Sequence, residues 1–412
     1  MEHVYASIDF GSSFIKLAVC ELYNNHLNLL AGISVPSSGI KKGLIVNPDL
    51  AKKSIAKAFD KAYDMLGIKV SKVIANVPCH LASYKIIKSE VNVAGELITG
   101  EDIMNCYKKG VKQFMMLDKE LVTVLPIDFK INDKTVMKDP KGFPGSKLSA
   151  RAMMVMVPKK NVYSVAQIIE SLGVEIVDIG ISSIGDMYCF KNESISKGIS
   201  VSLNIGDEIT VISLYNKGIP VASRVISIGG KDISSDLSYM YRISEDASLD
   251  IKKRFALASK RNASSSECYD VLNIQGENVT LKQTEVCEIV SSRLSEMFSL
   301  IKNEINLLTN KPIQYIIVTG GTSNMLDFEY CLRENMPNAT KGVIKLIGAR
   351  DNQYSTVIGN IIYFLNSLKL KGLDYSMFSE DDMDKLSSPN RQFLDASDGT
   401  MLSKVYNYFF GE

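Results

Sequence analysis

The sequence has no excess of charge of either sign, no paired cysteines and no long apolar run. Its formal net charge is +1 over 412 residues, so we expect no nucleic-acid partner. The seven cysteines are scattered without a Cys-x-x-Cys pair, and their odd number favours reduced thiols in a cytosolic protein over a disulfide framework or a zinc site. No apolar run reaches the length of a membrane-spanning helix. The N-terminus leads directly into a predicted strand, so we expect no signal peptide.

Histidine is also scarce. The chain has three histidines, His3, His26 and His80, and their positions match no metal-ligand spacing. We therefore expect no metal site built from protein ligands alone.

The most informative stretch is a short turn near the N-terminus. Residues 4–8 and 14–19 predict two buried strands, and Gly11, Ser12 and Ser13 lie between them. Such a turn leaves backbone N–H groups unpaired, its glycine permits close approach of a ligand, and its serines add hydroxyl donors. The pattern is suited to holding phosphate oxygens.

Asp9 ends the first of these strands and adds a carboxylate to the turn. Mg²⁺ prefers one or two carboxylates together with water and phosphate, so Asp9 is suited to hold a Mg²⁺-bound water. Taken alone, the same residues also fit an ordinary β-hairpin.

The chain is long enough for more than one hydrophobic core, and its pattern repeats. At 412 residues we expect two or more domains or lobes. Residues 200–221 predict a second strand–turn–strand meander, with its tight turn at Gly206-Asp207. Residues 314–319 predict a buried strand that ends in Gly320-Gly321-Thr322 and precedes a helix. This layout resembles the actin-like ATPase fold, in which two related lobes clamp a nucleotide.

Two other segments have a different character. Residues 85–172 predict a small α+β unit of β-α-β-β-α type, inserted between pieces of a larger domain. Residues 374–398 are rich in aspartate and glutamate and predict a flexible acidic linker.

The sequence also resembles one family in particular: FtsA, the bacterial actin-like cell-division protein. The resemblance covers residues 4 to about 370 and then the tail. It rests on residues 8–13, 39–43, 139–148 and 318–322 and on Gly229-Gly230 through Asp236. The run Asp-Pro-x-Gly-x-x-Gly-x-x-Leu at 139–148 is the most specific, because it lies in the inserted unit, which actin, Hsp70 and the sugar kinases lack at this position.

The resemblance implies an α/β protein with the actin-like ATPase (ribonuclease-H-like) two-lobe fold, an inserted α+β subdomain and a flexible C-terminal tail. The expected ranges are 1–84, 160–198 and 345–370 for the first lobe, 85–159 for the inserted subdomain, and 199–344 for the second lobe, with its outer subdomain at 230–310. An acidic linker at 371–398 and an amphipathic membrane-targeting helix at 399–412 are expected to follow.

The resemblance further implies a role in cell division. Such a protein polymerises on the cytoplasmic face of the cell membrane at the division site. It captures the C-terminal peptide of FtsZ, the tubulin-like ring protein, on its second lobe at about residues 230–310. It links the FtsZ ring to later division proteins, and the inserted subdomain contributes to self-assembly into filaments.

ATP with Mg²⁺ is the cofactor that the resemblance implies, bound between the lobes. The residues expected to contact it are Asp9, Gly11, Ser12, Ser13, Lys16, Gly206, Gly229, Gly230, Lys252, Gly320, Gly321 and Thr322.

The second phosphate loop departs from the pattern of the superfamily. In place of Asp-hydrophobic-Gly-Gly-Gly-Thr the chain has Asn204-Ile205-Gly206-Asp207-Glu208-Ile209, and the family's ribose-binding glutamate aligns with Leu249. The amide of Asn204 cannot act as a general base, and the two acids would repel phosphate. Either the chain binds ATP weakly without hydrolysing it, or it is a scaffold that has lost the nucleotide. We expect weakened binding and weak or absent hydrolysis, and we name no catalytic residue.

The C-terminal residues predict a short amphipathic helix. The side chains expected to bind a membrane are Met401, Leu402, Val405, Tyr406, Phe409 and Phe410. Lys404 is the only basic residue in the stretch, so binding must rest on apolar burial and on avidity within a polymer. The alternative is a helix that docks on the protein's own core or on a neighbouring copy.

Two other functions share this fold. One is a pilus-assembly adaptor similar to PilM, which also has the inserted subdomain but generally lacks a membrane-seeking tail. The other is a soluble kinase of the sugar- or acetate-kinase branch, against which the altered second loop and the aromatic tail argue.

Overall fold

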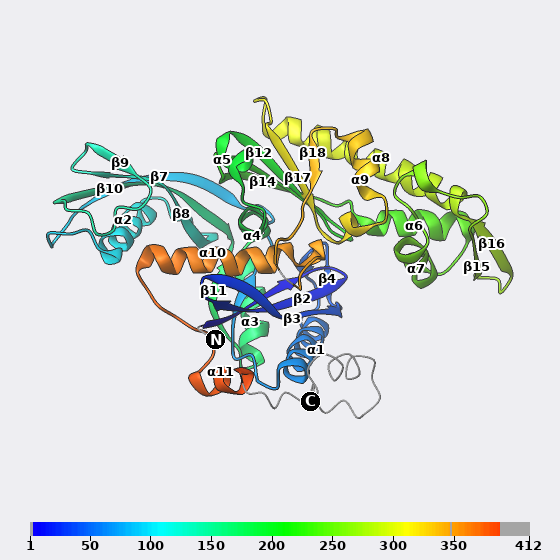
Figure 1. Cartoon of the computed structure of the whole chain (residues 1–412), viewed down its shortest axis with the longest axis horizontal. Coiled ribbons are helices and arrows are strands. Elements are labelled where there is room, and N and C mark those ends of the chain that lie inside the picture. The colour runs from blue at the N-terminus through cyan, green and yellow to red at the C-terminus, as the bar shows by residue number, and fades with distance from the viewer. Residues whose placement is uncertain (1–2, 347, 388–412) are drawn as a thin grey trace, which may run out of the picture.

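The computed structural model describes residues 3–346 and 348–387 and contains two five-stranded sheets of the same topology (Figure 1). The first joins an antiparallel meander to two parallel strands, in the order β3 (His26–Pro36), β2 (Phe14–Tyr23), β1 (His3–Phe10), β6 (Lys72–Asn76) and β11 (Glu175–Gly180). The second repeats this arrangement with β14 (Ile219–Ile226), β13 (Thr210–Asn216), β12 (Ile199–Ile205), β17 (Tyr315–Thr319) and β18 (Ala339–Lys341). The repeat predicted from the sequence is therefore confirmed.

Helices cover both faces of the first sheet. The helix α10 (Ser355–Lys371) lies on one face, and α1 (Pro48–Leu66) and α3 (Lys159–Ser171) lie on the other (Figure 1). Strand β1 is consequently buried along most of its length, which explains its nearly continuous apolar sequence.

Local sequence signals set the ends of α1. The Asn47 side chain accepts a hydrogen bond from the Leu50 N–H (3.1 Å), and Pro48 occupies the first helical position. Gly67 ends the helix in the left-handed conformation (φ 70°).

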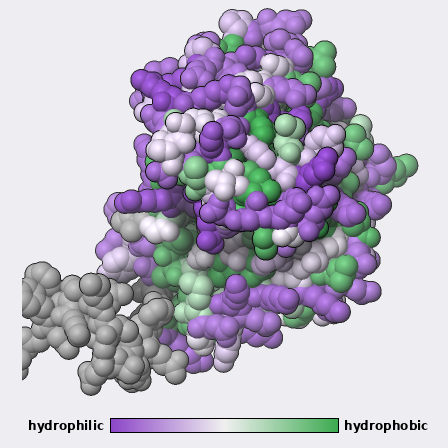
Figure 2. All heavy atoms as spheres, turned by 90° about the vertical axis from the view of Figure 1, so that its right-hand side faces the viewer, coloured by the Kyte–Doolittle hydropathy of each residue, from purple (hydrophilic) through white to green (hydrophobic). Residues whose placement is uncertain are grey.

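The second sheet carries a helical and hairpin extension at its outer end. Its elements are α6 (Gly230–Tyr241), α7 (Glu245–Arg254), the hairpin β15 (Cys268–Leu272)–β16 (Asn278–Lys282), α8 (Gln283–Leu308) and α9 (Phe328–Asn335). Figure 2 looks onto this end of the molecule, where hydrophilic side chains dominate and apolar side chains gather in smaller patches.

The inserted unit is a four-stranded sheet with one helix on it. Its elements are β7 (Ser83–Asn92), α2 (Gly100–Lys112), β8 (Lys119–Ile131), β9 (Thr135–Met137) and β10 (Lys147–Pro158), with the strand order β7-β10-β8-β9. It has a hydrophobic cluster of its own and projects away from the outer part of the second lobe (Figure 1). The remaining short elements are β4 (Ile40–Lys41), β5 (Leu44–Ile45), α5 (Glu193–Lys197), η1 (Lys260–Asn262), η2 (Gly321–Asn324) and η3 (Asn352–Tyr354).

The expected acidic linker at 371–398 is wrong over residues 374–387. This segment packs on the first lobe and ends in the helix α11 (Glu380–Ser387). The side chains of Met377, Phe378 and Leu386 are buried in the core of that lobe, and the Tyr5 hydroxyl donates to the Tyr375 carbonyl (2.7 Å). The density of acidic residues concealed these apolar anchors.

The two lobes are joined where α4 (Ser182–Cys189) crosses α10. The backbones meet at Gly185 and Gly359, where a Cβ on Gly359 would lie 1.7 Å from the Gly185 carbonyl oxygen, so only glycine fits this crossing. Beside it, the fully buried Asp186 carboxylate accepts hydrogen bonds from the Asn204 amide (2.9 Å) and the Ser355 hydroxyl (2.8 Å). Burial raises the pKa of Asp186 to about 6, and these hydrogen bonds oppose the shift.

We predict that Phe378→Ala destabilises the first lobe. The change removes a side chain that is buried in the core, with only 6% of its surface exposed. It should lower the free energy of unfolding by about 3 kcal/mol. Denaturant unfolding measures the effect. Leu373→Ala, at a 58% exposed position directly before this segment, is the control. Equal effects of the two changes would mean that residues 374–387 do not pack as described.

We also predict a signature of Asp186 in the dependence of stability on pH. Since its folded pKa lies above that of an unfolded aspartate, folding takes up a proton between about pH 4 and 6, and the stability contributed by this group falls as pH rises through that window. The free energy of unfolding of the natural chain minus that of Asp186→Asn should therefore decrease by about 3 kcal/mol from pH 4 to 7. Asp64→Asn, on the exposed side of α1, is the control; a difference that rises with pH would contradict the assignment.

Candidate functional site

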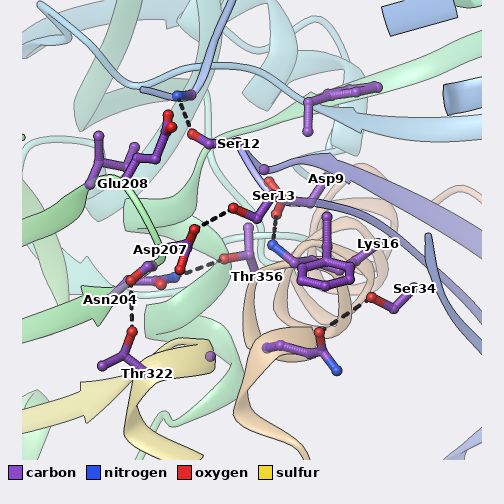
Figure 3. Close-up of a pocket in the computed structure, with 18 of the residues that line it drawn as sticks. Asp9, Ser12, Ser13, Lys16, Ser34, Asn204, Asp207, Glu208, Thr322 and Thr356 are labelled. Carbon is purple, nitrogen blue, oxygen red and sulfur yellow. Dashed lines mark hydrogen bonds and ion pairs between the residues drawn. The ribbon is translucent and has the colours of Figure 1, made fainter. Parts of the chain in front are cut away.

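A cavity of about 750 Å³ lies between the two lobes (Figure 3). Turns from both meanders line it: the turn between β1 and β2 from the first lobe, and the turn between β12 and β13 from the second. The turn after β17 and one face of α7 also line it. The cavity therefore lies where the repeated halves of the fold face one another.

The turn between β1 and β2 is held in shape by a hydrogen bond within its own backbone and by hydrogen bonds to two neighbouring turns. The Gly11 N–H donates to the Phe14 carbonyl (3.1 Å), and a Cβ on Gly11 would lie 2.6 Å from the same oxygen. The Ser12 hydroxyl accepts from the Gly43 N–H (2.9 Å). The Ser13 hydroxyl points across the cavity and donates to the Asp207 carboxylate of the second turn (Figure 3).

Asp9 is fixed by two side chains at the end of β1. Its carboxylate forms an ion pair with Lys16 (3.2 Å) and accepts from the Asn76 amide (2.8 Å). Asn76 in turn accepts from the Asn360 amide of α10 (3.1 Å). The carboxylate is thus partly neutralised and oriented at the floor of the cavity.

The second turn presents carboxylates where the superfamily has glycines. Asp207 lies 3.4 Å from the Lys252 ammonium in addition to its bond with Ser13. Glu208 accepts from the Lys42 N–H of the first lobe (2.7 Å) and pairs with Lys231 (3.4 Å). Both acids therefore contact the opposite lobe.

Lys252 is a buried cation behind this turn. Its ammonium donates to the Gly230 carbonyl (2.7 Å) as well as facing Asp207. Burial lowers the pKa of Lys252, and the Asp207 charge opposes that shift.

The structure brings most of the expected cofactor-binding residues to the cavity. The nine that line it are Asp9, Gly11, Ser12, Ser13, Lys16, Gly206, Lys252, Gly321 and Thr322. The other three, Gly229, Gly230 and Gly320, lie behind the second turn, where a Cβ on Gly229 or Gly320 would lie 2.4 Å from a carbonyl oxygen of that turn or of the strand before it. These three glycines therefore let the backbone pack closely against the second turn.

Sequence reasoning missed several residues of the cavity. Asn76 ends β6 beside the end of β1, and polar residues at the ends of adjacent parallel strands are the signal that would have found it. Lys253 gave no such signal. Its ammonium lies 4.9 Å from the centre of the Phe14 ring, a cation–π contact between the lobes.

The expected membrane-binding residues, 401–410, lie outside the described residues. Within 3–346 and 348–387, no helix has both the length and the apolar content needed to cross a bilayer.

Comparison with known proteins identifies relatives along most of the chain. A family model described as "Cell division protein FtsA" matches residues 201–359, and one described as "SHS2 domain inserted in FTSA" matches residues 80–156. Cell division protein FtsA of Bacillus subtilis (strain 168) is 28% identical over 378 residues, covering 90% of this chain and 85% of that protein. The FtsA of Streptococcus pneumoniae serotype 2 is 25% identical over 310 residues, covering 74% of this chain and 67% of that protein.

Solved structures share the fold at low sequence identity. The PilM-PilN type IV pilus biogenesis complex matches with a TM-score of 0.57 at 13% identity, covering 89% of this chain and 99% of that chain. MreB5 of Spiroplasma citri bound to ADP matches with a TM-score of 0.55 at 14% identity, covering 90% of this chain and 98% of that chain. These likenesses confirm the actin-like two-lobe fold expected from the sequence.

The two family models bear on the identity of the chain more directly. Both describe FtsA, they match separate segments, and together they account for more than half of the 412 residues. The chain belongs to the FtsA family of actin-like cell-division proteins.

Proposed function

We propose that this chain is a division scaffold that polymerises on the cytoplasmic face of the cell membrane and tethers the FtsZ ring to it. The observation that carries the proposal is the aromatic amphipathic stretch at 401–410, which follows an actin-like body of the FtsA family. An interfacial helix of this kind needs an apolar surface, and a bilayer interface supplies one.

The packing of α11 supports a definite orientation of the body. Only residues 388–400 separate the end of α11 from the aromatic stretch, and such a length spans at most about 45 Å when fully extended. The end of the molecule that carries α11 then faces the membrane. The outer part of the second lobe lies well away from α11 (Figure 1), and in this orientation it faces the cytoplasm.

That outer part is the surface we propose for the FtsZ C-terminal peptide. On α6, Tyr239 is 83% exposed and Met240 is 61% exposed, beside a shallow pocket of about 350 Å³. The Arg293 guanidinium of α8 lines the same pocket and pairs with Asp236 and Glu296. Exposed apolar anchors next to an ion-pair network suit a short peptide that carries both apolar and charged side chains.

The cavity between the lobes is the site we propose for ATP. Solved structures of MreB5 of Spiroplasma citri, which share the fold, are bound to ADP and to AMPPNP, and this supports a nucleotide there. The Gly11–Ser13 turn fits a phosphate group, and Asp9 is the carboxylate suited to a Mg²⁺-bound water. The second turn does not fit: Asn204 is an amide that donates to the Asp186 carboxylate and to Thr356, so position 204 offers no base to activate water. Mg²⁺, when bound, would neutralise phosphate charge.

Liposome sedimentation with FtsZ from the same bacterium tests the proposed function. We predict that the full-length chain pellets with liposomes and carries FtsZ with it, and that a chain ending at Ser397 pellets neither protein. Tyr239→Ala should pellet by itself but carry about tenfold less FtsZ, because an exposed aromatic anchor is lost.

Tyr63→Ala, at an exposed tyrosine of α1, is the matched control and should carry FtsZ normally. Equal pelleting of the full-length and shortened chains would contradict membrane anchoring. Full FtsZ recruitment by Tyr239→Ala would contradict the proposed docking surface. A change in pelleting with MgATP reports an effect of the nucleotide on assembly.

A further inference from the structure

The two acids of the second turn join the lobes directly. Asp207 comes from the β12–β13 turn and accepts a hydrogen bond from Ser13 in the β1–β2 turn, 194 residues away in sequence. Glu208 accepts from the backbone N–H of Lys42, also in the first lobe (2.7 Å). The bond between Ser13 and Asp207 crosses the cavity at the place where the β1–β2 and β12–β13 turns face one another (Figure 3).

The Asp207 carboxylate has the hydrogen-bonding partners that suit a phosphate group. One of its oxygens faces a hydroxyl of the first turn, and the other faces the buried ammonium of Lys252 at 3.4 Å. A hydroxyl donor and a lysine ammonium are common ligands of phosphate oxygens. Here the Asp207 carboxylate of the chain itself supplies the negative charge and the oxygen acceptors that a bound phosphate group would otherwise supply.

The backbone accommodates these side chains without strain. Neither Asp207 nor Glu208 has a positive φ, so the turn does not require glycine at either position. The exchange of glycine for acid therefore leaves the shape of the turn intact while it adds two bridges between the lobes.

We propose that Asp207 is a built-in substitute for a nucleotide phosphate, which closes the cleft of the ligand-free chain and must be displaced before a polyphosphate can bind. The inference rests on the proposed nucleotide site, and it extends that proposal to the class of ligand. A nucleoside leaves the Ser13–Asp207 bridge in place, whereas the phosphate tail of ATP competes with it. The phosphates of ATP should then add nothing to the affinity of the wild-type chain for the nucleoside.

Titration calorimetry of the full-length chain with adenosine and with MgATP tests the competition. We expect wild-type protein to bind ATP no more tightly than adenosine. Asp207→Gly should bind ATP at least about tenfold more tightly than wild type and leave adenosine affinity unchanged. Asp246→Asn removes a carboxylate from the lining of the same cavity and is the control for general charge repulsion.

Two results of this titration would overturn the inference. In one, Asp207→Gly gains no affinity for ATP. In the other, Asp246→Asn gains as much, which would assign the effect to net charge and not to the bridge.

A double-mutant cycle without any ligand tests the clamp itself. Ser13→Ala and Asp207→Ala should each lower the melting temperature. The double variant should melt no lower than the less stable single variant, because Ser13→Ala removes a hydrogen bond that Asp207→Ala has already removed. Additive shifts would show that the two side chains do not act together and would contradict the inference. Neither experiment involves the C-terminal stretch or FtsZ, so a failure of the membrane-tethering proposal is recognised separately by sedimentation.

Discussion

The contact between Ser13 and Asp207 links the two halves of a duplicated fold across the cavity that separates them. Each half is a five-stranded sheet with the same strand order, and each presents the turn of its antiparallel meander to the other. Where the superfamily has glycines in the second turn, this chain has acids, and their charge is balanced by Lys252 and Lys231 on the helices behind them. The second turn therefore binds the opposite lobe directly.

A second joint lies behind the cavity and limits how the lobes can move. The helices α4 and α10 touch through Gly185 and Gly359, and the buried Asp186 binds Asn204 at the end of β12. This joint is close-packed and polar, so it suits a pivot better than a sliding surface. On the proposed account, the clamp at Asp207 and the pivot at Asp186 act together to hold the two lobes closed.

Features that depend on neighbouring residues were predictable from the sequence. The Gly11–Ser13 turn follows from two flanking apolar strands, and the start of α1 follows from Asn47-Pro48. The repeat of the meander was visible because its apolar pattern recurs. Each of these features depends on residues that are close together in the sequence, so the sequence pattern alone predicts it.

Features that depend on residues far apart in the sequence were not predictable. The loop at Asp207 was correctly recognised as altered, but the donor that faces it lies 194 residues away, and only the folded chain shows the pairing. The packing of Phe378 was missed because its acidic neighbours dominate the composition of the segment. Composition describes the exposed face of such a segment and conceals the few side chains that anchor it.

Whether the cleft is closed without a nucleotide is tested most directly by the distance between the two lobes in solution. Pulsed electron resonance between genetically encoded spin labels at Tyr63 on α1 and Leu272 on the outer hairpin, both exposed, measures that distance in the full-length chain. A clamp at Asp207 predicts one narrow distribution for the ligand-free protein, unchanged by MgATP, and a broad distribution for Asp207→Gly that MgATP narrows. A broad distribution in the ligand-free natural chain that narrows on adding MgATP would contradict it.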